Sequence, residues 1–192
     1  MKIGIFIGCF NPVHMAHVAC AKELLEKGMI EKIIFVPVGD AYEKEGLVSA
    51  EHRLAMLEIV TKNEPKFEIS DVEIRHGKLY TYQTLDYYKE MYPRDEIYLI
   101  IGTDNLSQIY WWKKQNYILK SYNIIVLTRD NMKKEDFPKY SNFENIVFVN
   151  SNKPVSSTEI RKFIKNKNYK QAGKLLDDEV LEYIRSNNLF EE

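Results

Sequence analysis

The sequence predicts an α/β fold: a doubly wound sheet of parallel strands flanked by helices, in a chain of 192 residues. Strand-sized apolar runs alternate with helical patterns along the chain, the order typical of such folds. The two strongest runs, 97–101 and 124–127, are continuously apolar, as in parallel strands covered on both faces. From Ser156 onward nearly all residues favour helix, so we expect one domain over residues 1–192 with a helical subregion over 156–192.

The expected elements follow one another in a regular order. Strand-like runs cover Lys2–Ile7, Lys32–Val38, Phe67–Ile69, Glu96–Ile101, Asn123–Thr128 and Asn145–Val149. Helical patterns cover Ala16–Lys27, which stops at Gly28, then Ala50–Lys62, Tyr82–Met91, which stops before Pro93, and Asn116–Ser121. Asp177 and Asp178 are suited to capping the last helix. In such a sheet, ligands bind beyond the carboxyl ends of the strands.

Composition and charge exclude several classes of protein. The chain has 27 basic and 28 acidic residues, so no overall charge draws it to nucleic acid or to an anionic membrane. The apolar runs are strand-sized, and we find neither a signal-peptide core nor a transmembrane segment. Cys9 and Cys20 are too few for a disulfide framework and indicate reduced thiols. We therefore expect a cytoplasmic protein that binds neither nucleic acid nor membrane; its oligomeric state is left open.

The segment between the first strand and the first helix has the chemistry of a phosphate site. The strand ends at Gly8, an Asn-Pro turn follows, and His14 and His17 lie at the start of the helix. A glycine lets the backbone approach anionic oxygens, and a helix start offers unpaired N–H groups. Imidazoles three residues apart share a helix face and can reach one phosphate. Singly, the glycine indicates only a turn and the histidines half a metal site. However, the pair lacks the Glu of a zinc-protease helix, and the other histidines, His52 and His76, have no Cys or carboxylate grouping near them at ligand spacing.

A second candidate group follows the strongest strand. Gly102 would admit a nucleoside, and Asp104 would accept a hydrogen bond from a ribose hydroxyl; the alternative is a turn with a helix cap. Trp112 lies ten residues after Gly102. Its ring could stack on a flat heterocycle, although burial in the core is the commoner fate of tryptophan.

A third candidate group opens the C-terminal helices. Ser156, Ser157 and Thr158 precede Arg161 by about one helical turn. One interpretation is an ordinary capped helix start, in which Ser156 and Glu159 form a capping box. The other is that the hydroxyls, the free N–H groups and Arg161 bind a triphosphate.

Together these motifs resemble the nicotinate/nicotinamide mononucleotide adenylyltransferase family of the nucleotidylyltransferase superfamily, whose signature is (H/T)-x-G-H. The matching strings are G-C-F-N-P-V-H-M-A-H from Gly8, I-G-T-D from Ile101 with Trp112 after it, V-S-S-T-E-I-R from Val155, and V-L-E-Y-I-R with N-L-F from Val180. The segment 70–85 is similar to the S-x-x-E…S-Y-T-x-x-T-L of the bacterial branch. The resemblance spans nearly the whole chain and implies a Rossmann-like nucleotidylyltransferase fold.

Two single residues and one block depart from the family pattern. Ala16 stands where the superfamily usually has Gly; because alanine adds only a methyl group, we expect the histidine geometry to survive. Cys9 replaces the usual Ser, and this change should affect binding little if the position acts through its backbone amide. The block Val36–Leu47 stands where bacterial enzymes usually carry a P-P-H-K-like run, and it resembles the V-G-D-A-Y-K-K-K-G-L segment of the eukaryotic enzymes. This mixture leaves the pyridine preference open.

The resemblance implies that a mononucleotide phosphate attacks the α-phosphorus of ATP, giving a pyridine dinucleotide of NAD biosynthesis and pyrophosphate. The residues implied as catalytic are His14, His17 and Arg161. Those implied on the ATP side are Gly8, Cys9, Phe10, His14, His17, Gly102, Asp104, Arg129, Ser156, Ser157, Thr158 and Arg161. Those implied on the mononucleotide side are Lys44, Tyr80, Thr81 and Trp112. No protein metal site is implied, and Mg²⁺ would be carried by the ATP phosphates.

We expect nicotinate mononucleotide to be the preferred acceptor, because most of the chain resembles the bacterial branch. We also expect nicotinamide mononucleotide to be used, because no basic side chain in the ring-binding segments is placed to select a carboxylate by charge. Two alternatives stay open. One is another transferase of this fold, with phosphopantetheine or a phosphorylated polyol as acceptor; the other is a nucleotide-binding sensor without turnover.

Overall fold

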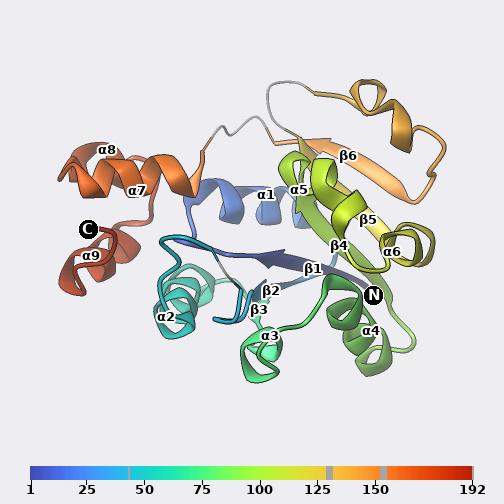
Figure 1. Cartoon of the computed structure of the whole chain (residues 1–192), viewed down its shortest axis with the longest axis horizontal. Helices are drawn as coiled ribbons and strands as arrows, with labels where there is room; N and C mark the ends of the chain where they lie inside the picture. The colour runs from blue at the N-terminus through green and yellow to red at the C-terminus, as the bar shows by residue number, and fades with distance from the viewer. Residues whose placement is uncertain (43, 129–131, 152–154, 192) are drawn as a thin grey trace.

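A computed structural model describes the chain except for residues 43, 129–131, 152–154 and 192 (Figure 1). The described residues form one sheet in which all strands are parallel, in the spatial order β3-β2-β1-β4-β5-β6. The strands are β1 (Lys2–Gly8), β2 (Lys32–Pro37), β3 (Phe67–Ile69), β4 (Glu96–Gly102), β5 (Asn123–Thr128) and β6 (Ile146–Asn150). The order reverses between β1 and β4, the switch point of a doubly wound fold. The predicted Rossmann-like fold is confirmed.

The longer helices lie within about one residue of their predicted ranges. They are α1 (Met15–Glu26), α2 (Ala50–Thr61), α4 (Thr81–Met91) and α6 (Gln115–Ser121). The short helices α3 (Val72–Arg75) and α5 (Thr103–Gln108) and the 3-10 turns η1 (Ile109–Trp111), η2 (Lys134–Asp136) and η3 (Pro138–Tyr140) were not predicted. None of the described helices is both long and apolar enough to cross a lipid bilayer.

The C-terminal region is helical, as expected. It consists of α7 (Ser157–Lys165), α8 (Tyr169–Gly173) and α9 (Asp178–Ser186). Asp177 caps α9, since its carboxylate accepts a hydrogen bond of 2.9 Å from the Glu179 N–H. Asp178 lies one residue further on, inside the first turn, where a negative charge also favours the helix start.

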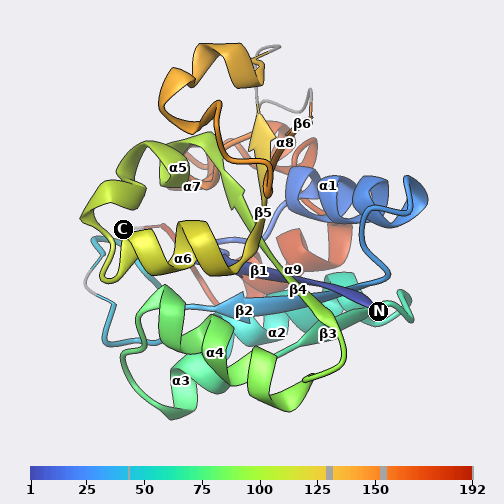
Figure 2. The same ribbon diagram turned by 90° about the vertical axis from the view of Figure 1, so that its right-hand side faces the viewer.

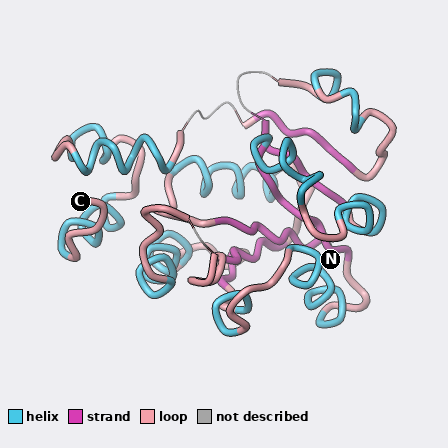
Figure 3. The backbone as a smooth tube through the Cα atoms, in the orientation of Figure 1, coloured by secondary structure: helices cyan, strands magenta, loops and turns pink. Residues whose placement is uncertain are grey.

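Both faces of the sheet are covered by helices, which explains the continuously apolar strands. Along β2, Ile33 and Phe35 belong to the core beneath α1, α2 and α7–α9, whereas Ile34 and Val36 belong to the core beneath α3–α6. Figure 1 shows α7–α9 on one side of the sheet and α4 and α6 on the other, and Figure 2 shows α4 and α6 in front of it. The strands therefore lie between two helical layers (Figure 3).

The carboxyl ends of the strands bring the candidate residues to one edge. Phe6 of β1 pairs with Ile100 of β4, so Gly8 and Gly102, each two residues further, lie at the same level. Gly8 pairs in turn with Pro37 at the end of β2. The loops that follow β1, β2 and β4 thus meet at the switch point, where such folds bind their ligands.

Candidate active site

The loop of residues 9–13, here called the β1 loop, begins with a constrained phenylalanine. Phe10 has a φ of +46°, an uncommon conformation for a bulky residue, and its side chain is buried against Phe6 and Phe35. A Cβ at Gly8 would lie 3.1 Å from the Phe10 ring, a tight contact, so packing alone favours glycine here. Because the Phe10 ring is in the core, its predicted contact with ATP would have to come from the backbone.

The two histidines lie together at the start of α1, as predicted. His14 is the N-cap residue, and its backbone N–H donates to Nδ1 of His17 over 3.2 Å. The rings stack with centroids 3.7 Å apart and an interplanar angle of 20°. Ala16, the departure from the family signature, is buried and leaves this pair intact. Both imidazoles therefore stand beside the N–H groups of the first helical turn.

Lys44 reaches the β1 loop from the segment between β2 and α2. Its ammonium lies 3.6 Å from Sγ of Cys9. The lysine is otherwise exposed, so its charge is available to an anion at this edge. The structure thus brings together two residues that the sequence places 35 positions apart.

Arg161 reaches the same loop from α7. Its Nη1 donates to the backbone oxygen of Asn11 over 2.8 Å, and its Nη2 donates to the Thr158 hydroxyl over 3.3 Å. Burial lowers the pKa of the Arg161 guanidinium from its ordinary value. Two cations from different segments, Lys44 and Arg161, therefore contact the β1 loop at Cys9 and Asn11.

The two serines at the start of α7 have structural partners. Ser156 accepts a hydrogen bond of 3.1 Å from the Glu159 N–H, so it caps the helix. Ser157 donates to the backbone oxygen of Pro12 over 3.0 Å and so fastens α7 to the β1 loop. Ser156 thus caps the helix through one half of the expected capping box, and the proton of the Ser157 hydroxyl is directed at the protein.

The edge beyond β4 is open. Gly102 is the N-cap residue of α5, and Asp104 lies exposed in the first turn. A Cβ at Gly102 would meet no atom within 4 Å, so the backbone has space in front of it. Helix capping and nucleoside binding are compatible at this position. Arg129, also predicted for the ATP side, lies outside the described residues.

The predicted ring-binding residues form a wall between α4 and α6. Trp112 is half-buried, and Tyr80 is the exposed N-cap residue of α4, just before Thr81. The ammonium of Lys113 lies 4.7 Å from the Tyr80 ring centroid, and that of Lys114 lies 4.4 Å from the Tyr82 ring centroid. These positions argue against the expectation that no basic side chain is placed to select a carboxylate by charge.

The chain is similar to known proteins over its whole length. Residues 5–163 match the cytidylyltransferase-like family. A probable nicotinate-nucleotide adenylyltransferase of Caldicellulosiruptor bescii is 38% identical over 200 residues, with 99% of each chain covered. One of Carboxydothermus hydrogenoformans is 35% identical over 198 residues, with 98% of each chain covered. The chain belongs to the nicotinate-nucleotide adenylyltransferase family. The resemblance seen in the sequence motifs is thereby confirmed.

A solved structure of another protein has the same fold as this chain. The Plasmodium falciparum nicotinic acid mononucleotide adenylyltransferase complexed with NaAD superposes with a TM-score of 0.84. The match covers 99% of this chain and 97% of the other at 23% sequence identity. At that identity the likeness concerns the fold alone.

The packing of α3 against α4 contains a buried carboxyl group that the sequence did not single out. Glu73 of α3 is 4% exposed and accepts a hydrogen bond of 2.7 Å from the Thr84 hydroxyl of α4. Burial raises its pKa to about 7, and the bond from Thr84 opposes that shift. The only sequence signal was that both residues belong to the bacterial-branch motif. The backbone of α3 also lies directly against Gly39: a Cβ added to Gly39 would be 2.6 Å from the backbone oxygen of Glu73.

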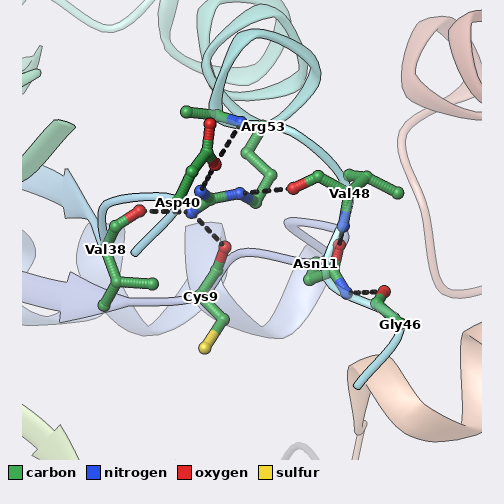
Figure 4. A network of polar contacts seen from close by, with 8 residues as sticks. Cys9, Asn11, Val38, Asp40, Gly46, Val48 and Arg53 are labelled. Atoms are coloured by element: carbon green, nitrogen blue, oxygen red, sulfur yellow. Dashed lines mark hydrogen bonds and ion pairs between the residues drawn. The ribbon is translucent and has the colours of Figure 1, made fainter. Parts of the chain in front are cut away.

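Arg53 of α2 is a second residue that was missed. Its side chain is completely buried, and it binds backbone oxygens of both the β1 loop and the segment that carries Lys44 (Figure 4). The available signal was an arginine on the apolar face of a predicted helix, three positions from Met56 and four from Leu57. A charge at such a position indicates a buried polar partner, but not which one.

Metal ligands do not gather at this edge in the part of the chain that the structure describes. No group of three or more His, Cys, Asp or Glu side chains with the arrangement of a metal site occurs among those residues. The side chains nearest the β1 loop are imidazoles, an ammonium and a guanidinium, whereas Mg²⁺ prefers hard oxygen ligands. These residues suit phosphate oxygens and do not fit a resident Mg²⁺ ion.

Proposed function

We propose that the enzyme joins nicotinate mononucleotide to the AMP moiety of ATP, a step of NAD biosynthesis that forms nicotinate adenine dinucleotide and releases pyrophosphate. Relatives named for this activity match along the full chain. The single structural observation that carries the proposal is the stacked pair of His14 and His17 at the start of α1, with ring centroids 3.7 Å apart. Donors gathered in this way at a helix N-terminus suit a polyphosphate.

The reaction is a single in-line displacement. An oxygen of the mononucleotide phosphate attacks the α-phosphorus of ATP and supplies the electron pair of the new P–O bond. The bond between the α-phosphorus and the bridging oxygen breaks, and pyrophosphate leaves with its electron pair. Because the nucleophile is already an anion, neither a general base nor a covalent intermediate is required. The site must align two anions and stabilise the charge that develops between them.

The residues around the β1 loop divide these tasks. His14 and His17 donate to the triphosphate, where negative charge builds up in the transition state. Lys44 holds the incoming mononucleotide phosphate. Arg161 has five N–H donors in its guanidinium, and its bonds to Asn11 and Thr158 use two of them. Lys44 thus serves the acceptor phosphate, and Arg161 serves the triphosphate of ATP.

The adenosine half of ATP fits the open edge beyond β4. Gly102 leaves space in front of its backbone, and the exposed carboxylate of Asp104 suits a ribose hydroxyl as donor. This edge adjoins the end of β1, so the adenosine and the α-phosphate can be bound at neighbouring strands.

The pyridine half of the acceptor fits the wall of Trp112, Tyr80 and Thr81. Trp112 stacks on the pyridine ring, and the backbone N–H groups near Thr81 and after Trp112 meet its carboxylate or carboxamide. Lys113 and Lys114 add positive charge at the same wall. Their charge favours the carboxylate of nicotinate over the neutral amide, so nicotinamide mononucleotide is the weaker substrate.

Mg²⁺ enters this scheme with the substrate. Its preferred ligands are oxygens, and the triphosphate of ATP supplies them, with water completing the shell. No step of the displacement is assigned to a metal ion held by the protein.

The experiment is to measure pyrophosphate release from ATP with four acceptors supplied separately. These are nicotinate mononucleotide, nicotinamide mononucleotide, phosphopantetheine and glycerol 3-phosphate. We expect rapid release with the first, slower release with the second and none above background with the others. Release with phosphopantetheine or the polyol phosphate alone would reassign the acceptor. ATP binding without release in any mixture would make the protein a sensor.

A further inference from the structure

Arg53 is a charged side chain in a fully buried position. It lies on the inner face of α2 together with Met56 and Leu57, and all three side chains are 0% exposed. Burying a guanidinium is costly unless its donors are paired. The partners of Arg53 therefore show which parts of the protein this charge holds together.

The acceptors of Arg53 lie in two segments that meet at the active site. Nη1 donates to the backbone oxygen of Cys9 in the β1 loop over 3.4 Å and to that of Val38, just after β2, over 2.6 Å. Nε donates to the backbone oxygen of Val48 over 3.0 Å, and Nη2 pairs with Asp40 at 2.8 Å. Figure 4 shows the guanidinium in the centre of this ring of oxygens.

Two neighbours complete the network. The Asp40 oxygen that pairs with Arg53 also accepts a 2.7 Å bond from the Ala50 N–H, at the start of α2. Asn11 of the β1 loop binds the Gly46 oxygen over 2.7 Å and accepts from the Val48 N–H over 3.1 Å. The segment 38–48 is therefore fastened at both ends and tied to the β1 loop.

Lys44 lies in the middle of that fastened segment, 3.6 Å from Cys9. We infer that Arg53 is a positioning residue: without touching either substrate, it sets the position of Lys44, and so of the acceptor phosphate, relative to the β1 loop that binds ATP. The inference rests on the proposed function. In-line displacement depends on this alignment, and an error of about 1 Å can cost about 100-fold in rate.

The same geometry predicts which kinetic constants change. Arg161 and Ser157 hold the β1 loop from α7, independently of Arg53. The ATP side should therefore remain in place when Arg53 is altered, whereas the Lys44 segment loses its bonds to Arg53 and keeps those to Asn11. A purely structural role for Arg53 would lower stability without separating the two substrates.

The test compares Arg53→Lys with Met56→Ala, a control on the same buried face of α2 without polar contacts to the Lys44 segment. Thermal unfolding is measured alongside kcat and both KM values. We expect Arg53→Lys to lower kcat by about 10- to 100-fold and to raise KM for nicotinate mononucleotide, with KM for ATP within about threefold of the parent. Met56→Ala should lower the unfolding temperature while both KM values stay within about threefold.

Asp40→Ala serves as a second variant, because the Asp40 side chain is 59% exposed and its removal leaves the core packed. It should raise KM for nicotinate mononucleotide and leave KM for ATP unchanged. The inference is overturned if the Arg53 and Asp40 variants change both KM values equally, or if their activity loss matches that of Met56→Ala at equal loss of stability. A parent enzyme that makes no dinucleotide would instead refute the proposed function.

Discussion

At the scale of single residues, the site depends on donors that are held before substrate arrives. His14 and His17 stack on one another at the start of α1, and the β1 loop is bound from α7 by Arg161. Preorganised donors of this kind stabilise transition-state charge without reorganisation during the reaction. Substitution at one of them should therefore affect the rate far more than the fold.

We expect His17→Ala to fold normally and to lower kcat by roughly 10²- to 10³-fold, because a donor to the transition state is lost. Circular dichroism checks the fold, and steady-state kinetics with saturating ATP give kcat. His52→Ala is a matched control, since the His52 ring pairs with the Tyr183 hydroxyl of α9. Turnover of His17→Ala within about threefold of the parent would make His17 a packing residue.

Lys44→Ala should mainly raise KM for the mononucleotide, because a charge beside the acceptor phosphate acts on that substrate alone. KM for ATP should stay close to that of the parent. Lys62→Ala, on the far end of the following helix, controls for the loss of one positive charge. A larger loss for ATP than for the mononucleotide would assign Lys44 to the triphosphate.

At the scale of elements, the packing of α3 against α4 contains the buried pair of Glu73 and Thr84. The pKa of Glu73 is raised to about 7, so the folded state holds this proton more tightly than the unfolded chain. The stability it contributes is complete below the ordinary glutamate pKa and is lost as pH rises through about 7. Folding of this element pair should therefore be sensitive to pH near neutrality.

We expect the parent to lose about 2 kcal/mol of unfolding free energy between pH 5.5 and 8 through this one group. Glu73→Gln removes the titrating group. The difference in urea-unfolding free energy, variant minus parent, should therefore rise by about 2 kcal/mol between pH 5.5 and 8. Glu90→Gln, exposed on α4, should follow the parent curve. If the Glu73→Gln and parent curves run parallel, Glu73 is ionised in the folded protein.

At the scale of the whole molecule, the strand and helix pattern was predictable because both core layers impose clear apolar runs on the sequence. Strand ends shifted by about one residue, as at Gly8 and Gly102. The helices α3 and α5, of four and six residues, are too short to show a helical period.

Less of the site was predictable, because it depends on three-dimensional contacts. His14, His17 and Arg161 stood out as phosphate-binding candidates by their residue types at predicted helix starts, whereas Lys44 was found only through resemblance to a family. Arg53 was missed because three of its oxygen partners are backbone atoms, which have no sequence signature, and the fourth, a carboxylate oxygen of Asp40, lies 13 positions away. The positions of Lys113 over the Tyr80 ring and of Lys114 over the Tyr82 ring were also not predictable, because they are contacts between segments far apart in the sequence.

The preference between the two pyridine acceptors is a property of the assembled wall. We expect kcat/KM to favour nicotinate mononucleotide, with the nicotinamide form used at a rate within about 10³-fold. Lys113→Gln should reduce that ratio by removing one positive charge, whereas Lys120→Gln, exposed on α6, should leave it unchanged. An unchanged ratio in Lys113→Gln would show that Lys113 does not select the acceptor, and a strong preference of the parent for the amide would show that the Gly39–Leu47 block controls specificity.

The central claim is that this site transfers an adenylyl group directly from ATP to a pyridine mononucleotide. Incubation with ATP labelled at the α-phosphate, followed by separation of nucleotides and protein, tests it most directly. With nicotinate mononucleotide present, the label should appear in the dinucleotide in an amount equal to the pyrophosphate released, and none should remain on the protein. Label that stays in ATP with this acceptor, or that becomes covalently attached to the protein, would contradict the account.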